Sequence, residues 1–184
     1  MSISCSHALA VLAFSGALMF AGGAPAQEPT PATPPQPEVT ITITDSTANQ
    51  MLSQAFAATV GVDQKSDAGY QKGYDIRGNP VREEYENARR GGSLTALVHG
   101  RFTVAVEVVE LPAEELRTWF DRVDLAKLEA LEPEKGQPLV RDTKLIPYVP
   151  DPPVGWMAQP ATSLGSQGAG FQISQATRVY RKKK

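Results

Sequence analysis

The sequence predicts an α+β protein: an antiparallel sheet of three to four strands with helices on one face, followed by a Pro-rich, lightly structured C-terminal extension. Three observations carry this prediction. Apolar and polar residues alternate with period two in residues 39–44 and again in 94–109, as in half-buried strands. Apolar residues recur at helical spacing in 51–60 and 116–131, and from residue 133 onward prolines interrupt regular structure.

The first twenty-six residues have the composition of an export signal. They contain no Asp, Glu, Lys or Arg, and the apolar run 8–21 would span about 21 Å as a helix. That length is short of the roughly 30 Å hydrocarbon core but typical of a signal peptide. Ala24-Pro25-Ala26 matches a cleavage pattern, so we expect Gln27 to begin a periplasmic or secreted chain. The alternative is an uncleaved anchor or a buried apolar helix.

Cleavage would change the chemistry open to the chain. It removes Cys5 and His7, which leaves a cysteine-free protein whose one imidazole is His99. A disulfide, a thiol nucleophile and a cysteine metal ligand are then excluded. The formal net charge of −2 gives no argument for nucleic-acid binding, and we expect no transmembrane span after cleavage and no cofactor.

The expected organisation has four parts. Residues 1–26 are the signal peptide, and residues 27–37 form a Pro-rich linker of extended, polyproline-like backbone. Residues 38–132 form the α+β domain. Residues 133–184 form the Pro/Gly-rich extension, with a possible final strand from Phe171 to Tyr180 and a basic tail.

The first half of the domain is expected to read strand, helix, loop. The threonines and β-branched residues of 39–44 predict the strand, and Asp45-Ser46-Thr47 followed by Gln50 has the pattern of a helix cap. The helix over 51–60 would end at Gly61. Residues 63–74 read as a loop, and residues 79–90 fit a helix or a strand, with a strand favoured because it would complete a meander.

The second half contains a hairpin and two short helices. Residues 94–98 and 102–109 alternate around the turn at Gly100, which predicts an antiparallel pair. Pro112 opens a helix whose buried stripe is expected to be Leu116, Trp119, Phe120 and Val123. Asp124 would cap a second helix that carries Leu125, Leu128 and Leu131.

Catalytic chemistry has little support in the sequence. His99 is the candidate base, but it lies at the predicted hairpin turn without a nucleophile motif nearby. Paired acids occur at Glu83-Glu84 and Glu114-Glu115, with Asp121 and Asp124 further along; neighbouring acids on a strand point to opposite faces, and those at a helix start suit the helix dipole. No metal-ligand spacing occurs.

Two features are candidates for binding a partner. Trp156, within a Pro-rich segment, is either a ligand platform or an anchor that fixes the segment to the core. The tail of Arg181, Lys182, Lys183 and Lys184 is either a solvated terminus or a weak contact for anionic surfaces such as lipid head groups.

Several phrases together resemble small uncharacterised exported proteins of Gram-negative bacteria. They are Glu83-Glu84-Tyr85, Gly100-Arg101-Phe102, the run from Val123 to Leu131, Gly155-Trp156 and Arg178-Val179-Tyr180. The resemblance implies a periplasmic location and no established enzymatic activity. Such proteins continue beyond the position of Tyr180 into a further strand, so the C-terminal part of this chain is expected to be incomplete or divergent.

The leading hypothesis is a non-enzymatic binding or accessory module for an unknown protein, envelope component or small ligand. A second hypothesis is a small hydrolase or lyase that uses His99 with a carboxylate such as Glu107, Asp121 or Asp124. A third is an envelope-associated structural protein that docks through its basic tail.

Overall fold

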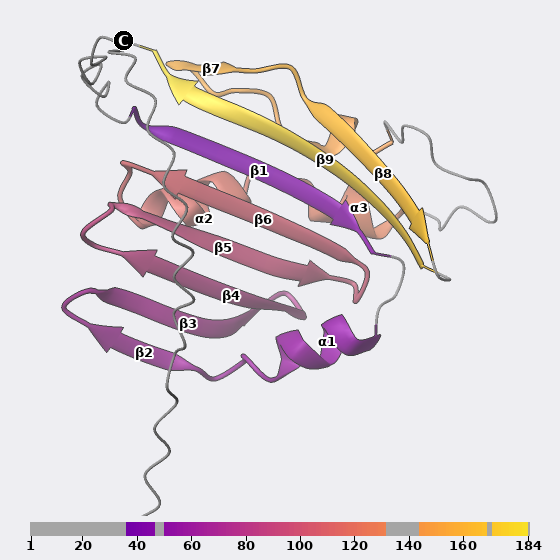
Figure 1. Cartoon of the computed structure of the whole chain (residues 1–184), viewed down its shortest axis with the longest axis horizontal. Coiled ribbons are helices and arrows are strands. Elements are labelled where there is room, and N and C mark those ends of the chain that lie inside the picture. Colours follow the sequence, from indigo (N-terminus) through magenta and orange to yellow (C-terminus); the bar gives the residue numbers. More distant parts are fainter. Residues whose placement is uncertain (1–35, 47–49, 132–143, 169–170, 184) are drawn as a thin grey trace, which may run out of the picture. The chain divides into compact units, whose positions relative to one another are not determined.

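The chain folds around one large antiparallel sheet. Its structure, a computed structural model, describes residues 36–46, 50–131, 144–168 and 171–183. The nine strands have the order β2-β3-β4-β5-β6-β1-β9-β7, and β8 also pairs with β9 (Figure 1). The strands are β1 (Glu38–Asp45), β2 (Asp63–Ser66), β3 (Gly69–Ile76), β4 (Asn79–Glu86), β5 (Gly91–Val98), β6 (Phe102–Val109), β7 (Trp156–Ala158), β8 (Thr162–Gly168) and β9 (Phe171–Lys182). The helices are α1 (Gln50–Ala57), α2 (Glu114–Phe120), α3 (Leu125–Glu129) and the 3-10 helix η1 (Ile146–Tyr148).

The predicted fold class is wrong. The sheet has nine strands rather than three to four, and only 17% of the described residues are helical. The helices do not share one face, because α2 and α3 pack on the side of the buried core whereas α1 lies on the opposite side. The supposed extension belongs to the sheet: β9 pairs with β1 along the whole of β1.

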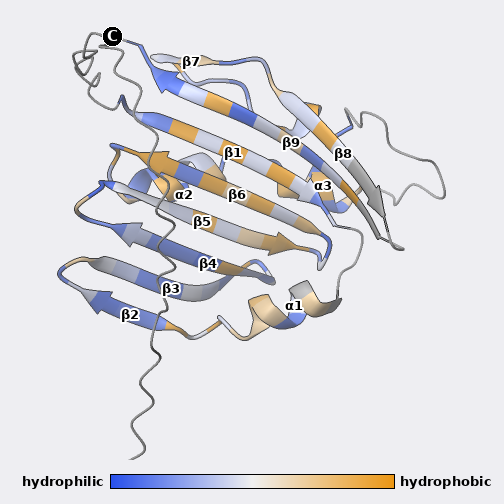
Figure 2. Ribbon diagram, viewed as in Figure 1, coloured by the Kyte–Doolittle hydropathy of each residue, from blue (hydrophilic) through white to orange (hydrophobic). Residues whose placement is uncertain are grey.

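The alternation along β1 divides the sheet into two faces. Val39, Ile41 and Ile43 are fully buried and define the inner face, whereas the threonines between them are half-buried on the outer face. Figure 2 shows the same alternation of apolar and polar residues along β6. Because directly paired residues share a face, the registers of β1 with β6 and β9 extend this division across the sheet.

An aromatic contact fixes the C-terminal region to the core. Trp119 of α2 lies edge-on to Trp156 of β7, with ring centroids 4.9 Å apart, and 4.6 Å from the ring of Tyr180 in β9. The Tyr180 hydroxyl also donates a hydrogen bond to the Pro150 carbonyl (2.6 Å). Trp156 is therefore placed as an anchor of the segment after η1 rather than as an open platform.

Local predictions had mixed outcomes. The hairpin is present as β5 and β6, and the Asp124 carboxylate caps α3 by accepting a hydrogen bond from the Lys127 backbone amide (3.2 Å). Residues 79–86 form a strand, as favoured. The loop predicted over 63–74 is wrong, since most of it forms β2 and β3. The α1 stripe is not a core stripe, because Met51 is 78% exposed.

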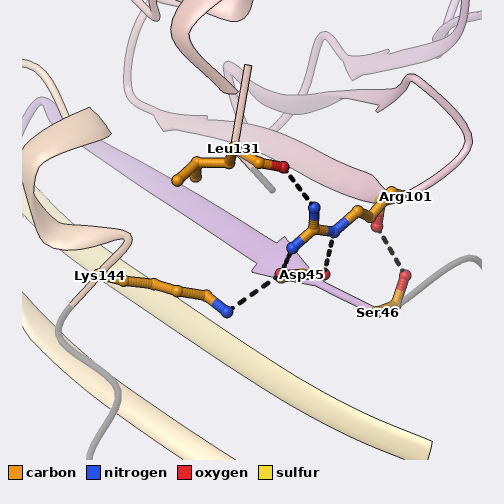
Figure 3. A network of polar contacts seen from close by, with 5 residues as sticks. All are labelled: Asp45, Ser46, Arg101, Leu131 and Lys144. Carbon is orange, nitrogen blue, oxygen red and sulfur yellow. Dashed lines mark hydrogen bonds and ion pairs between the residues drawn. The ribbon is translucent and has the colours of Figure 1, made fainter. Parts of the chain in front are cut away.

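Of the predicted cap Asp45-Ser46-Thr47, Thr47 lies outside the described residues. Asp45 is a buried charge at the end of β1. Its carboxylate is 3% exposed and accepts two hydrogen bonds from the Arg101 guanidinium, at 2.9 and 2.5 Å. Lys144 contributes a second cation at 3.3 Å, and Arg101 donates to the Leu131 carbonyl at 2.6 Å (Figure 3). This network joins the end of β1 to the β5–β6 turn, to Leu131 two residues after α3, and to the segment before η1.

We expect Asp45→Asn to lower the free energy of unfolding by about 3–5 kcal/mol, because it removes the buried carboxylate that two largely covered cations share. Urea denaturation measures the loss. Arg101→Lys, which keeps the charge but not the two-pronged geometry, should cost less. The exposed edge residue Asp63 gives the matched control, and Asp63→Asn should change stability by less than about 0.5 kcal/mol. An Asp45→Asn midpoint equal to that of the wild type would contradict this role.

Candidate functional site

A groove on the outer face of the sheet is the candidate functional site. Its larger part is a cavity of about 500 Å³ over β3 to β6, a volume typical of small-ligand sites. Gln71, Glu84, Ser93 and Glu107 form one row across these four strands, because each is paired with the next. The remaining lining residues are Tyr70, Tyr85, Glu86, Arg89, Gly91, Gly92, Val108 and Val109.

A second cavity of about 240 Å³ lies between α1 and the outer face. It shares Glu84 and Ser93 with the first, so the two cavities adjoin; we call them together the outer groove. Ala55 and Phe56 of α1 supply its apolar wall. Its other lining residues are Thr59, Arg82 and Thr95.

Two glycines allow this arrangement. At Gly73 a Cβ atom would lie 1.6 Å from the Thr59 carbonyl oxygen, so only glycine lets the chain after α1 cross β3 on the outer face. At Gly92 a Cβ atom would lie 2.2 Å from the Glu84 carbonyl oxygen, so β4 and β5 approach closely beneath the groove. These two glycines therefore allow both the path of the chain after α1 and the close approach of β4 and β5 that forms the floor of the groove.

The groove carries both signs of charge, with carboxylates in excess in its larger part. Glu84 pairs with Arg82 at 2.9 Å and accepts a hydrogen bond from the Ser93 hydroxyl at 3.3 Å. Glu86 lies 3.7 Å from Arg89. Glu107 is exposed, and no hydrogen bond or ion pair of its side chain occurs among the described residues. A cationic group entering the groove would find this carboxylate unpaired.

On the inner face, Tyr70, Tyr74 and Glu83 form what we call the tyrosine–glutamate cluster. Both phenol hydroxyls donate to the Glu83 carboxylate, that of Tyr70 at 2.5 Å and that of Tyr74 at a shorter distance. Lys72 lies over the Tyr70 ring, 4.2 Å from its centroid, and Tyr74 also interacts with Arg117 of α2. Since all three members are half-buried and satisfied within the protein, we interpret the cluster as the polar border of the core.

Adjacent acids thus have different surroundings. Glu83 points to the inner face and Glu84 to the outer face, as expected for neighbours on a strand. The sequence indicated this separation but not which tyrosines would meet Glu83, because that depends on the β3–β4 register. The outer groove was missed, since its residues come from four strands and one helix.

His99 has no catalytic surroundings in the described part of the chain. It is exposed in the β5–β6 turn with φ +53°, and its backbone amide donates to the Asn79 side chain at 3.0 Å. The two cavities of the groove do not include it, and of the carboxylates considered as its partners only Glu107 lines the groove.

The basic tail is partly within the sheet. Arg181 belongs to β9 and pairs with Glu38 at 2.8 Å, while Lys182 pairs with Trp156 of β7. The Lys183 backbone amide donates to the Gly155 carbonyl, and Lys184 lies outside the described residues. The side chains of residues 181–183 are exposed, so they are accessible to an anionic surface.

The described residues lack two kinds of feature. No group of three or more His, Cys, Asp or Glu side chains could hold a metal ion. Nor does this part of the chain contain a helix long and apolar enough to cross a membrane.

We expect Tyr70, Tyr74 and Tyr180 to resist ionisation in the folded protein. Burial, followed by the hydrogen bonds to Glu83, raises the pKa of Tyr70 and Tyr74, and burial raises the pKa of Tyr180 to about 12. A raised pKa stabilises the fold fully below the unfolded value of about 10, and this stabilisation is lost as pH rises through the folded pKa. Tyrosinate absorbance and urea denaturation, recorded across that alkaline range, measure both effects.

Glu83→Gln tests the cause of these shifts. Loss of the charged acceptor should lower the pKa of Tyr70 and Tyr74 and reduce stability by about 1–2 kcal/mol. Tyr180, which does not contact Glu83, serves as the internal control and should still titrate with a pKa of about 12. Unchanged titration of all three phenols would contradict the cluster.

No protein-family model matches the chain, and no curated protein or solved structure is significantly similar to it. Its function must therefore be inferred from its own residues and geometry.

Proposed function

We propose that the chain is an exported, non-enzymatic binding module that holds an elongated ligand in the outer groove. The ligand would carry an apolar group at one end and a cationic group at the other. The observation that supports this most directly is the junction at Glu84 and Ser93, where the apolar cavity beside α1 meets the larger cavity rich in carboxylates. The export part rests on the composition of residues 1–26.

The apolar end of the groove suits a small hydrophobic group. Phe56 is only half-buried, and together with Ala55 it lines the cavity of about 240 Å³. Filling this space would remove the exposed part of the Phe56 ring from water, which favours binding.

The other end suits a cation. Glu84, Glu86 and Glu107 line the larger cavity, where Arg89 is the only cationic side chain among the lining residues. Since Arg82 and Arg89 already pair with Glu84 and Glu86, the carboxylate of Glu107 is the one that would attract and orient a ligand cation. Because strands supply all three carboxylates, their spacing is set by the sheet rather than by a loop.

The other functional hypotheses have less support. A hydrolase or lyase would need His99 beside a carboxylate in a common cavity, and the groove does not include His99. A second candidate role is docking through the basic tail, which the exposure of residues 181–183 supports. It does not use the groove, and the two roles do not conflict.

The peptide acetyl-Phe-Gly-Lys-amide is a suitable probe, since it carries one apolar and one cationic side chain. In an amide-resolved NMR titration we expect saturable shifts in β4, β5 and α1. Glu107→Gln should weaken binding about two- to fivefold, the range of an exposed ion pair, and added salt should reduce the effect of the substitution. Phe56→Ala should weaken binding through loss of the apolar wall.

Glu129→Gln is the matched control, because it removes an exposed carboxylate of α3, on the inner side of the sheet, away from the groove. The Glu129→Gln variant should bind the peptide with the same affinity as the wild type. The proposal fails if the shifts map to another surface, or if Glu107→Gln and Glu129→Gln behave alike.

Export is tested separately. After expression in a Gram-negative host and fractionation, the mass of the protein in the periplasm or medium should correspond to a chain that starts at Gln27. Recovery of residues 1–26 still attached to envelope-bound protein would replace the cleaved signal with an anchor.

A further inference from the structure

The two edges of the sheet differ in how they are protected against pairing with another strand. β2 forms one edge, and β7 and β8, both paired with β9, form the other. Edge strands expose unpaired backbone donors and acceptors, and natural proteins protect them with charge, proline or short length. The described edges can be compared on each of these features.

β2 is protected in two ways. It is only four residues long, and it carries Asp63 and Lys65, both exposed. Asp67 follows it directly in the turn to β3. A strand added here would gain few hydrogen bonds and would have to accommodate three charges.

At the other edge β7 is also short, with three residues, but the seven-residue β8 lacks comparable protection. From Trp156 to Gly168 the chain has no Asp, Glu, Lys or Arg, and Pro160, which lies between the two strands, is its only proline. Leu164 of β8 is 65% exposed and Met157 of β7 is 54% exposed. Both lie on the outer face, because they pair with Gln175 and Arg181 of β9, which share that face with the polar side of β1.

We propose that β8 pairs antiparallel with β8 of a second copy of this chain, which joins the two sheets across a twofold axis. Self-pairing suits an uncharged strand, because a twofold axis repeats every side chain in both copies and any charge near the axis would face its like. The Pro-rich segment 27–37 is a poor alternative partner, because its prolines have no amide hydrogen to donate to the edge.

A twofold axis at Leu164 gives the pairing a definite geometry. The Leu164 side chains of the two copies lie directly opposite each other on the outer face, and Ser163 of each copy faces Gly165 of the other. Pro160 precedes β8 and lies where the pairing ends. Because it has no backbone amide hydrogen, this position avoids the loss of a hydrogen bond within β8. The interface is one strand wide and smaller than that of a standard stable complex, so the dimer should dissociate in the micromolar range.

Sedimentation velocity tests this with the full chain carrying Cys5→Ser, so that residues 1–26 are common to every sample. The Cys5→Ser chain without a further substitution should sediment as a dimer at about 100 μM. Leu164→Lys should raise the dimer dissociation constant at least about tenfold, because it places two cations opposite each other. Met51→Lys, at an exposed apolar residue of α1, is the matched control and should leave the dimer unchanged.

Oxidative crosslinking tests the register. In the same Cys5→Ser chain, Leu164→Cys should form a disulfide-linked dimer, because directly opposed residues bring their Cβ atoms to about 4.5–5.5 Å, from which a small shift reaches the roughly 3.5–4.5 Å of a disulfide. Val60→Cys, exposed beyond α1, should remain monomeric under the same conditions.

Three results would overturn the proposal. One is a wild-type chain that stays monomeric at the concentration given, which would leave the edge to a foreign strand. Another is a dimer that persists unchanged in Leu164→Lys, and the third is assembly into species larger than a dimer. Because no residue of the outer groove is altered, peptide binding to that groove can succeed or fail independently of these results.

Discussion

The buried carboxylate of Asp45 is the constraint on which the arrangement of the sheet depends. A charge that is 3% exposed is tolerated only with close partners, and these come from far along the chain: Arg101 in the β5–β6 turn and Lys144 before η1. Arg101 in turn donates to Leu131, just after α3. Satisfying one carboxylate therefore places the end of β1, the hairpin turn, the end of α3 and the start of the C-terminal region at one point. It also fixes β1 against β6, since Asp45 pairs with Phe102 in that register.

The position of β1 explains how the sheet has a core face on one side and a polar face on the other. β1 lies between β6 and β9, so the first and last strands of the described chain are neighbours. Their inner residues and the aromatic stripe of α2 build one core, in which Trp119 contacts both Trp156 and Tyr180. Most of the outer face is left to polar side chains, and the groove and α1 lie there. The strands that carry a binding surface on the outer face are held rigid by the core packed against their inner face.

β4 illustrates how one strand serves both faces. Glu83 turns inward, where two phenols satisfy its charge at the border of the core, and Glu84 turns outward into the groove. The period of two along a strand separates neighbours in this way. The same rule places Leu164 and Met157 on the outer side of the β7–β8 edge, next to the threonines of β1 rather than over the core. One edge of the sheet is thus charged and short, while the other is uncharged and exposes apolar side chains.

The sequence by itself determined the local elements whose periodicity is strong. The alternation of β1, β5 and β6, the buried stripe of α2 and the Asp124 cap of α3 follow from residue type and spacing alone. It did not identify β2 and β3, because β2 is entirely polar and Lys72 interrupts the apolar face of β3. These strands form only through pairing, β3 with β4 and β2 with β3. The role of Asp45, the partners of Glu83 and the outer groove were decided by tertiary structure. Each is made by residues distant in sequence, and only the register of the strands brings them together.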